Sequence, residues 1–162
     1  GYSKDLEVNF DKIFFDFHKM PYRIEFIREC FGVKFYNDSA ATNPISTIAA
    51  IKTFDDPYIL ISGGSSKNLS YVRMAEEVCK DPNLIAIHLT GNTAEEIRIA
   101  LTNAGYTGKI ELFDSLGDAL DATKIHFKEI KSVLYSPASA SFDNFENYIK
   151  RGEYFSNLVN KL

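Results

Sequence analysis

Hydrophobic residues along the 162-residue chain follow two alternating patterns. Short, nearly continuous apolar runs are typical of strands buried in a parallel sheet. These runs lie at residues 58–62, 84–89 and 132–135, and a further strand is expected at residues 109–113. Between them, apolar residues return every three or four positions, as they do on one face of an amphipathic helix. This pattern predicts helices at residues 44–54, 70–79, 93–104, 116–128 and 144–161.

The part of the chain before residue 44 follows other patterns. Residues 5–17 have helical spacing of their apolar side chains and are expected to form a short amphipathic helix that ends before Pro21. Residues 23–27 and 32–37 alternate polar and apolar positions, and the short turn between them predicts a hairpin. Strands that alternate with helices predict a single α/β domain: a Rossmann-like, doubly wound, mostly parallel sheet with an antiparallel hairpin at one edge.

Residues with strong positional preferences mark the ends of several predicted helices. Asn43 followed by Pro44 is a typical N-cap with proline in the first turn. Ser70 and Thr93 are the expected N-caps of the next two helices, and Gly105 is the expected stop signal of the second.

Composition and charge exclude several classes of protein. The chain is 45% hydrophobic and 25% charged, which is typical of a folded globular domain. Its net charge of −4 argues against nucleic-acid binding, which requires a basic surface. No apolar run approaches the roughly 20 residues of a membrane span, and no leader sequence is recognisable, so a cytoplasmic location is expected. Cys30 and Cys79 fit no metal-binding spacing and are expected to be reduced thiols.

Ligands of doubly wound sheets bind beyond the carboxyl ends of the strands. The loops expected there are rich in small and hydroxyl-bearing residues, and Lys67 is their one basic residue. They span residues 37–43, 62–67, 90–93 and 136–141. Helix N-termini that follow such loops favour negative charge, because their backbone N–H groups are free. An anionic ligand is therefore expected, and a carboxylate fits a single lysine at least as well as a triphosphate.

Structural explanations remain open for each of these residues taken alone. Gly63 and Gly64 can serve only a tight turn, Asp38 can serve as a loop cap, and Lys67 can be solvated. His88 is interpreted as a core histidine, because it lies inside an apolar run. The chain contains no phosphate-loop motif, no zinc-binding spacing and no dinucleotide fingerprint, so no metal site is expected within it.

Four segments together resemble the C-terminal domain of the D-glutamate-adding members of the Mur ligase family. Phe35-Tyr-Asn-Asp-Ser-Ala-Ala-Thr-Asn-Pro resembles the opening motif of that domain, and Ile59-Leu-Ile-Ser-Gly-Gly-Ser-Ser-Lys resembles the next. Residues 135–152 resemble the final motif, and Pro21-Tyr-Arg-Ile-Glu matches the stretch that leads into the domain. Other Mur ligases usually have an Asp-Tyr-Ala-His type of sequence where this chain has Asp-Ser-Ala-Ala, which favours the D-glutamate-adding branch.

The resemblance implies a part in ATP-dependent amide formation. In this family, the L-alanine carboxylate of UDP-N-acetylmuramoyl-L-alanine becomes an acyl phosphate, which the amine of D-glutamate attacks. The C-terminal domain binds the amino acid and carries no catalytic residue of its own. By this resemblance, Lys67 pairs with a carboxylate of D-glutamate, Thr42 and Ser141 donate hydrogen bonds, and Phe142 and Tyr148 shape the pocket.

The resemblance also implies which residues face the nucleotide. Arg23, Asp38 and Asn43 fall at positions from which the family reaches ATP. The chain departs from the family at Ala40, where the best-known members have a lysine, and at Tyr22, where histidine is usual.

The resemblance further predicts the organisation of a longer enzyme. Residues 1–20 correspond to a linker and helix that follow a central domain, and residues 21–162 correspond to the C-terminal domain. ATP and Mg2+ would bind mainly to the central domain, and UDP-N-acetylmuramoyl-L-alanine to the other domains of a monomeric enzyme. The chain alone is expected to be inactive. Two alternatives remain: a stand-alone flavodoxin-like module that binds a nucleotide or phosphate, and the same domain of another Mur or folylpolyglutamate-type ligase.

Overall fold

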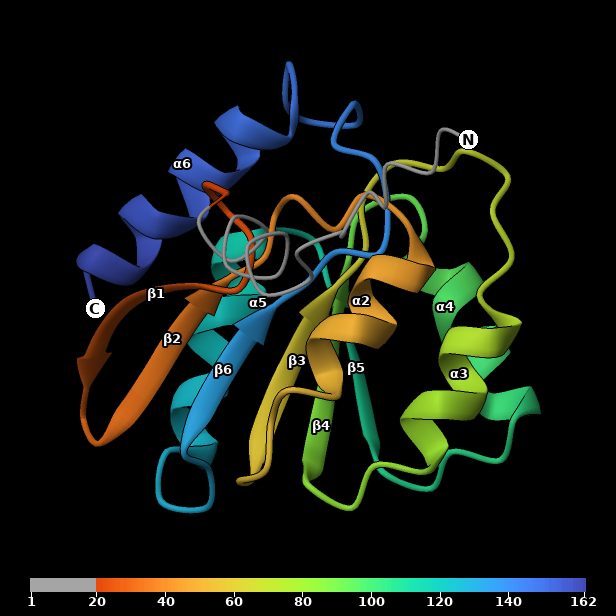
Figure 1. Ribbon diagram of the computed structural model, residues 1–162, viewed down its shortest axis with the longest axis horizontal. Coiled ribbons are helices and arrows are strands. Elements are labelled where there is room, and N and C mark those ends of the chain that lie inside the picture. The colour runs from red at the N-terminus through yellow and green to blue at the C-terminus, as the bar shows by residue number, and fades with distance from the viewer. Residues whose placement is uncertain (1–19) are drawn as a thin grey trace, which may run out of the picture.

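The computed structural model describes residues 20–162 as a six-stranded sheet covered by helices on both faces (Figure 1). The helix expected at residues 5–17 lies outside the described residues. In spatial order the strands are β1, β2, β6, β3, β4 and β5. Their bounds are β1 (Glu25–Cys30), β2 (Val33–Asn37), β3 (Tyr58–Ser62), β4 (Leu84–Thr90), β5 (Lys109–Phe113) and β6 (Ser132–Tyr135).

The pairing of the strands confirms the predicted sheet. β1 and β2 form an antiparallel hairpin at one edge, and every other neighbouring pair is parallel. The helices are α2 (Pro44–Ile51), α3 (Val72–Cys79), α4 (Ala94–Asn103), α5 (Leu116–Asp121), the 3-10 helix η1 (Ala122–His126) and α6 (Tyr148–Asn160).

Successive residues of the central strands pack into two separate cores, because side chains alternate across a strand. Leu60 and Leu134 lie on the face covered by α2, α3 and α4. Ile59 and Val133 lie on the opposite face, against α5 and α6. Figure 1 shows α2 in front of the sheet and α5 behind it. This two-sided burial explains the nearly continuous apolar runs of the sequence.

Some predicted helix ends are wrong. Ser70 is not the N-cap of α3, because Tyr71 occupies that position. The Tyr71 hydroxyl lies 2.7 Å from Ser139 Oγ in the loop after β6. Packing against that loop therefore determines where the helix begins. The helix expected at residues 116–128 divides into α5 and η1 and ends at His126. The last helix begins at Tyr148, four residues later than expected, because the Asn147 side chain caps it.

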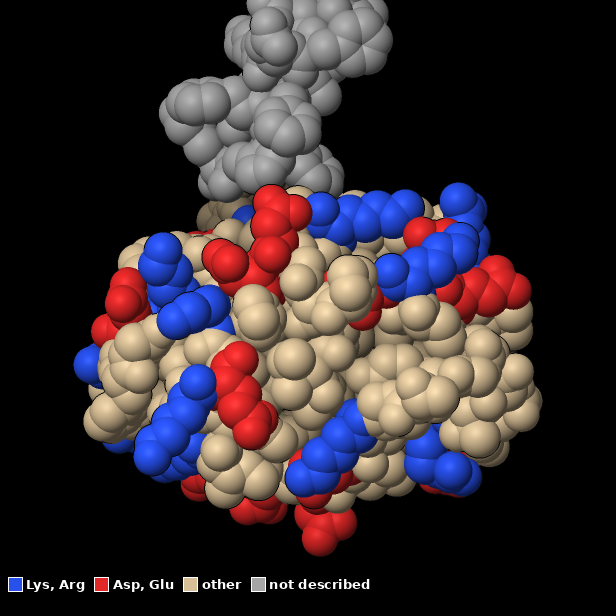
Figure 2. All heavy atoms as spheres, turned by 90° about the horizontal axis from the view of Figure 1, so that it is seen from below, with Lys and Arg blue, Asp and Glu red and all other residues tan. Residues whose placement is uncertain are grey.

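The surface at the amino ends of the parallel strands carries basic and acidic side chains in alternation (Figure 2). Neither sign gathers into a patch on this face, which gives it no electrostatic preference for a polyanion. Within residues 20–162, none of the helices has the length and apolar character needed to cross a membrane.

Candidate functional site

Three loops from the carboxyl ends of neighbouring strands meet at one edge of the sheet, as the sequence predicts. They follow β2, β6 and β3, which are adjacent in the sheet. The Asp38 N–H donates to the Tyr135 carbonyl oxygen at 2.7 Å, and the Gly63 N–H donates to the Pro137 carbonyl oxygen at 2.8 Å. Ser65 and Ala140 form an isolated antiparallel bridge. Backbone hydrogen bonds therefore join segments that lie 74 to 97 residues apart in the sequence.

Gly63 and Gly64 make the close approach of these loops possible. Gly63 has a φ of +106°, and a Cβ atom there would lie 1.9 Å from the Thr90 carbonyl oxygen. A Cβ atom on Gly64 would lie 2.4 Å from the Ala140 carbonyl oxygen. Both atoms belong to the backbone and cannot rotate away, so the two glycines are required by packing whatever the ligand.

Asp38 joins the β2 loop to the β6 loop from inside the domain. Its side chain is fully buried: Oδ2 accepts a 2.7 Å hydrogen bond from the Ser136 hydroxyl, and Oδ1 accepts one from the Ile24 N–H at 3.1 Å. Burial raises the pKa of Asp38 to about 6, although both hydrogen bonds and the charge of Arg23 favour the ionised form. Because its two oxygens already accept protein hydrogen bonds, Asp38 acts here as a link between segments.

Arg151 is the largest buried charged side chain among the described residues, and it holds two of the loops together. Its Nη1 donates to the carbonyl oxygens of Ser139 (2.9 Å) and Ala140 (2.8 Å), and its Nη2 donates to the Ser39 carbonyl oxygen (2.9 Å). Its Nε donates to the Ser39 hydroxyl at 3.1 Å. Burial lowers the pKa of the guanidinium. The positive charge is thus stabilised by carbonyl oxygens, which in turn become fixed in position.

Lys67, Ser141 and Phe142 come together at the tips of the β3 and β6 loops. The Lys67 ammonium lies over the Phe142 ring, 5.5 Å from its centroid. The Phe142 N–H donates to the Ser65 hydroxyl at 2.9 Å, which fixes Phe142 next to the β3 loop. Ser141 is buried, whereas Lys67 is exposed and Phe142 is 66% exposed. A cation and an aromatic ring are therefore exposed together at the tips of these two loops.

The remaining predicted residues lie on the loop before α2 and at the start of α6. Thr42 is half-buried, and its N–H donates to the Ala40 carbonyl oxygen at 3.0 Å. Asn43 is the N-cap of α2, as predicted, and its side chain accepts a hydrogen bond from the Ser46 N–H. Tyr148 is the first residue of α6, and its carbonyl oxygen accepts a 2.8 Å hydrogen bond from the Ser39 hydroxyl.

A cavity of about 360 Å3 opens beside these loops, at the carboxyl ends of β3, β4 and β5. Gly64, Gly91, Asp114, Phe145 and Arg151 are among its lining residues, which include none of the eight predicted site residues. The cavity therefore lies next to the predicted residues without being lined by them.

Three curated proteins are similar to this chain over most or all of its length. The chain is 40% identical over 147 residues to a UDP-N-acetylmuramoylalanine--D-glutamate ligase of Thermosipho melanesiensis, with 91% of this chain and 33% of that protein covered. The ligase of the same name from Clostridium novyi is 38% identical over 155 residues, with 93% and 33% covered. That of Caldicellulosiruptor bescii is 36% identical over all 162 residues, with 34% of that protein covered.

This chain belongs to the Mur ligase family. It spans about a third of the length of the curated relatives that it matches, and it corresponds to their C-terminal part. The structure is similar to that of MurF from Acinetobacter baumannii, with a TM-score of 0.58 at 17% identity, covering 85% of this chain and 31% of that one. This likeness supports the Mur ligase C-terminal fold. No protein-family model matches the chain.

The two departures of this Mur ligase domain from its family lie side by side. The Ala40 N–H donates to the Tyr22 carbonyl oxygen at 2.9 Å. The Tyr22 ring also packs over Gly152, where a Cβ atom would lie 2.4 Å from Tyr22 Cδ1. Tyr22 thus contacts both the β2 loop and α6, so a side chain at this position affects two parts of the site.

Sequence reasoning missed the two residues that hold the site of this Mur ligase domain together most directly. Arg151 lies four and eight residues before Phe155 and Val159 and shares their buried face of α6. A charged residue on an apolar stripe is a signal that could have been noticed. Thr93 is the N-cap residue of α4, as expected, but its side chain makes no capping hydrogen bond. Its hydroxyl accepts the Gly64 N–H at 3.0 Å and lies 2.8 Å from Ser139 Oγ.

Proposed function

We propose that the chain is the amino-acid-binding domain of a longer ligase that adds D-glutamate to UDP-N-acetylmuramoyl-L-alanine at the expense of ATP. The observation that carries the proposal is the assembly of Lys67, Ser141 and Phe142 at the tips of two loops. The similarity to curated D-glutamate ligases along almost the whole chain supports it.

The chemistry of D-glutamate fits these loops. The ligand brings two carboxylates, and a lysine with nearby hydroxyl groups supplies the charge-assisted hydrogen bonds that they require. Lys67 is proposed to pair with one carboxylate, Thr42 and Ser141 to donate hydrogen bonds, and Phe142 and Tyr148 to shape the pocket. Holding the amine near an activated acyl group removes a large entropic part of the barrier, so positioning is the contribution of this domain.

ATP and Mg2+ are proposed to bind mainly to another domain of the ligase. Arg23, Asp38 and Asn43 would face the nucleotide from this side. Since the oxygens of Asp38 already bond Ser136 and Ile24, we propose that Asp38 acts on the nucleotide indirectly, by placing the neighbouring Arg23. The enzyme is proposed to work as a cytoplasmic monomer.

Two assays test this proposal. The full-length protein that carries this chain should release ADP in the presence of UDP-N-acetylmuramoyl-L-alanine and D-glutamate, and much less with L-glutamate or a diamino acid. A preference for another amino acid would assign the chain to a different ligase of the family.

The 162-residue chain by itself should show no ATP hydrolysis above a heat-denatured control, because its sequence contains no phosphate loop. ATP turnover by this chain, or tight nucleotide binding to it, would instead support a stand-alone nucleotide-binding module.

A further inference from the structure

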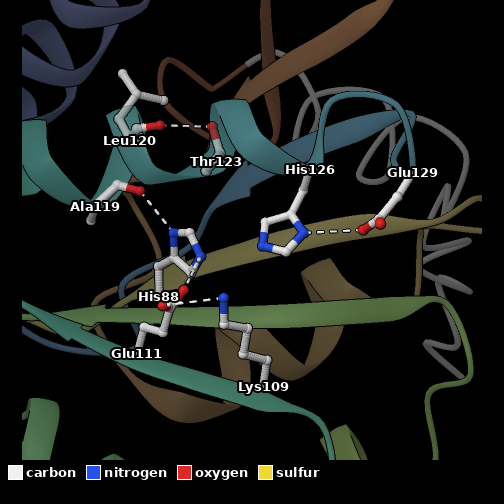
Figure 3. A network of polar contacts seen from close by, with 8 residues as sticks. All are labelled: His88, Lys109, Glu111, Ala119, Leu120, Thr123, His126 and Glu129. Atoms are coloured by element: carbon white, nitrogen blue, oxygen red, sulfur yellow. Dashed lines mark hydrogen bonds and ion pairs between the residues drawn. The ribbon is translucent and has the colours of Figure 1, made fainter.

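Three side chains with metal-binding groups converge on the side of the sheet covered by α5, away from the loops described above (Figure 3). His88 comes from β4, Glu111 from the neighbouring strand β5, and His126 from the end of η1. One ligand atom from each of these residues lies within 4.8 Å of the other two. Successive residues of this group are 23 and 15 positions apart in the sequence, a spacing that matches no metal-binding motif.

The three converging atoms are buried and lack hydrogen-bond partners. They are His88 Nε2, Glu111 Oε2 and His126 Nε2. His88 is fully buried, and its Nε2 approaches Glu111 Oε2 at 3.4 Å. A buried polar atom without a partner is destabilising, and three that face one another are unusual in a folded domain. Their common position indicates that something else satisfies them.

Hydrogen bonds to the other atoms of these groups orient both imidazole rings. His88 Nδ1 lies 2.8 Å from the Ala119 carbonyl oxygen, which only accepts, so the proton is on Nδ1 and the Nε2 lone pair points into the cluster. His126 Nδ1 lies 3.1 Å from Glu129 Oε2, a contact that likewise places the proton on Nδ1.

An outer contact also orients the Glu111 carboxylate. Its Oε1 pairs with Lys109 Nζ at 3.2 Å, and its Oε2 remains directed at the two imidazoles. A histidine that bonds a backbone carbonyl and another that bonds a carboxylate are the outer contacts typical of metal-binding histidines. Figure 3 shows these outer partners on the far sides of the rings, away from the cluster.

We propose that His88, Glu111 and His126 bind a divalent transition-metal ion, with Zn2+ as the best fit. Two imidazole nitrogens and one carboxylate oxygen form a known zinc ligand set, and water completes the tetrahedron. With Zn–N distances of about 2.0–2.1 Å, ligand atoms of a tetrahedral site lie about 3.3 Å apart. His88 Nε2 and Glu111 Oε2 are already 3.4 Å apart, so it is the third ligand atom that has to approach, by at most about 1.5 Å. His126 can make this movement, because it ends a short 3-10 helix and its side chain is partly exposed.

Such an ion would join three separate segments. β5 is an edge strand, and η1 leads out of the helix that covers it. A metal ion that joins β4 to β5 and η1 would stabilise this edge of the domain. The site would therefore be a structural one, and binding to the folded state alone would raise thermal stability with metal concentration.

Titration of the metal-free 162-residue chain, without an affinity tag, tests the proposal with Zn2+ itself. We expect one equivalent of Zn2+ to bind and the melting temperature to rise until the site is saturated. Glu111→Gln and His126→Ala should each weaken binding at least about 100-fold, and Glu129→Gln, which changes an outer contact, about 10-fold. Glu96→Gln is the matched control, because it changes an exposed carboxylate of α4 outside the cluster, and it should bind Zn2+ like the parent.

A second readout covers the case in which a cluster variant fails to fold. In the parent chain, Zn2+ should shift the 15N resonances of Nε2, and not of Nδ1, in both His88 and His126. Co2+ in its place should give the visible absorption of a four-coordinate ion. Absence of stoichiometric binding, binding unchanged by Glu111→Gln and His126→Ala, or Zn2+ that leaves both Nε2 resonances in place would overturn the proposal and leave a His88–Glu111 ion pair only.

Discussion

The ammonium group of Lys67 lies over the aromatic ring of Phe142, although the two residues belong to loops that follow different strands. The ring holds the cation without neutralising it, since the face of an aromatic ring carries only partial negative charge. Among the ion pairs of the described residues, none involves Lys67. The Phe142 ring therefore positions the Lys67 ammonium group, which can still bind a ligand carboxylate.

Replacement of Lys67 by alanine in the full-length ligase should therefore weaken the use of D-glutamate. A charge-assisted hydrogen bond to a partly desolvated carboxylate is worth about 1.5–3 kcal/mol, so kcat/KM for D-glutamate should fall at least about ten-fold. The KM for UDP-N-acetylmuramoyl-L-alanine should stay nearly unchanged, because that substrate is expected to bind another domain. Steady-state kinetics with each substrate varied in turn measures both effects.

Lys128→Ala is the matched control for this experiment. Lys128 is also an exposed lysine, and it precedes β6 at the opposite end of the sheet. Equal kinetics for the Lys67 variant, the Lys128 variant and the parent would show that Lys67 is only a solvated surface residue.

Arg151→Met should destabilise the domain strongly. The methionine fills part of the volume but leaves the carbonyl oxygens of Ser39 and Ser139 without the guanidinium donor. The Ala140 carbonyl oxygen keeps only its hydrogen bond from the Ser65 N–H. Loss of these buried hydrogen bonds should lower the free energy of unfolding by about 3 kcal/mol or more, measured by urea denaturation. Lys150→Met, on the exposed side of the same helix, should change it little. A small effect at Arg151 would mean that the loops hold their arrangement without it.

Asp38→Asn should change how stability depends on pH. The pKa of Asp38 in the folded domain is about 6, against an ordinary value of 3.8, so the folded state binds the proton more tightly than the unfolded chain does. The contribution of Asp38 to stability therefore increases as the pH falls from about 6 to about 4. The free energy of unfolding of the parent, minus that of the variant, should be greater at pH 4 than at pH 7 by on the order of 2–3 kcal/mol. A difference that does not vary with pH would show that the carboxylate titrates normally.

Gly63→Ala should disrupt the meeting of the β3 and β4 loops. The new methyl group would overlap the Thr90 carbonyl oxygen. The positive φ angle of Gly63 also disfavours any residue with a Cβ atom. We expect a loss of at least about 2 kcal/mol in thermal or chemical denaturation. Gly117→Ala provides the contrast: this residue is in α5, its methyl group would have room, and the variant should be more stable by about 0.5–1 kcal/mol. Similar behaviour of the two variants would contradict the steric argument.

The alternating apolar patterns were sufficient to predict the sheet, because burial on two faces requires continuous apolar strands such as β3 and β6. They were also sufficient to place the three loops at one edge, since the carboxyl ends of parallel strands coincide there. Helix ends were less predictable. The start of α3 depends on the contact between Tyr71 and Ser139, residues 68 positions apart, which no local pattern contains.

The interior of the site was the least predictable part. Gly63 and Gly64 belong to a loop that was expected to bind a ligand, yet the close approach of other backbone segments already requires them. Arg151 looked like one more polar residue of a helix, and its role depends on carbonyl groups of two loops that only the fold brings near it. His88 is buried in the core, as predicted, but only the fold brings Glu111 and His126 next to it.

The strand that completes the sheet is the last one to be made. β6 lies between β2 and β3, so a growing chain on the ribosome holds the β1–β2 hairpin and the β3–β4–β5 unit apart, each with an open edge, until residues 132–135 emerge. Open edges can pair with the wrong partner. A chain that stops before Tyr135 should therefore aggregate instead of forming a smaller domain, and insertion of β6 should limit the rate of folding, because its contacts with β2 close a loop of nearly 100 residues.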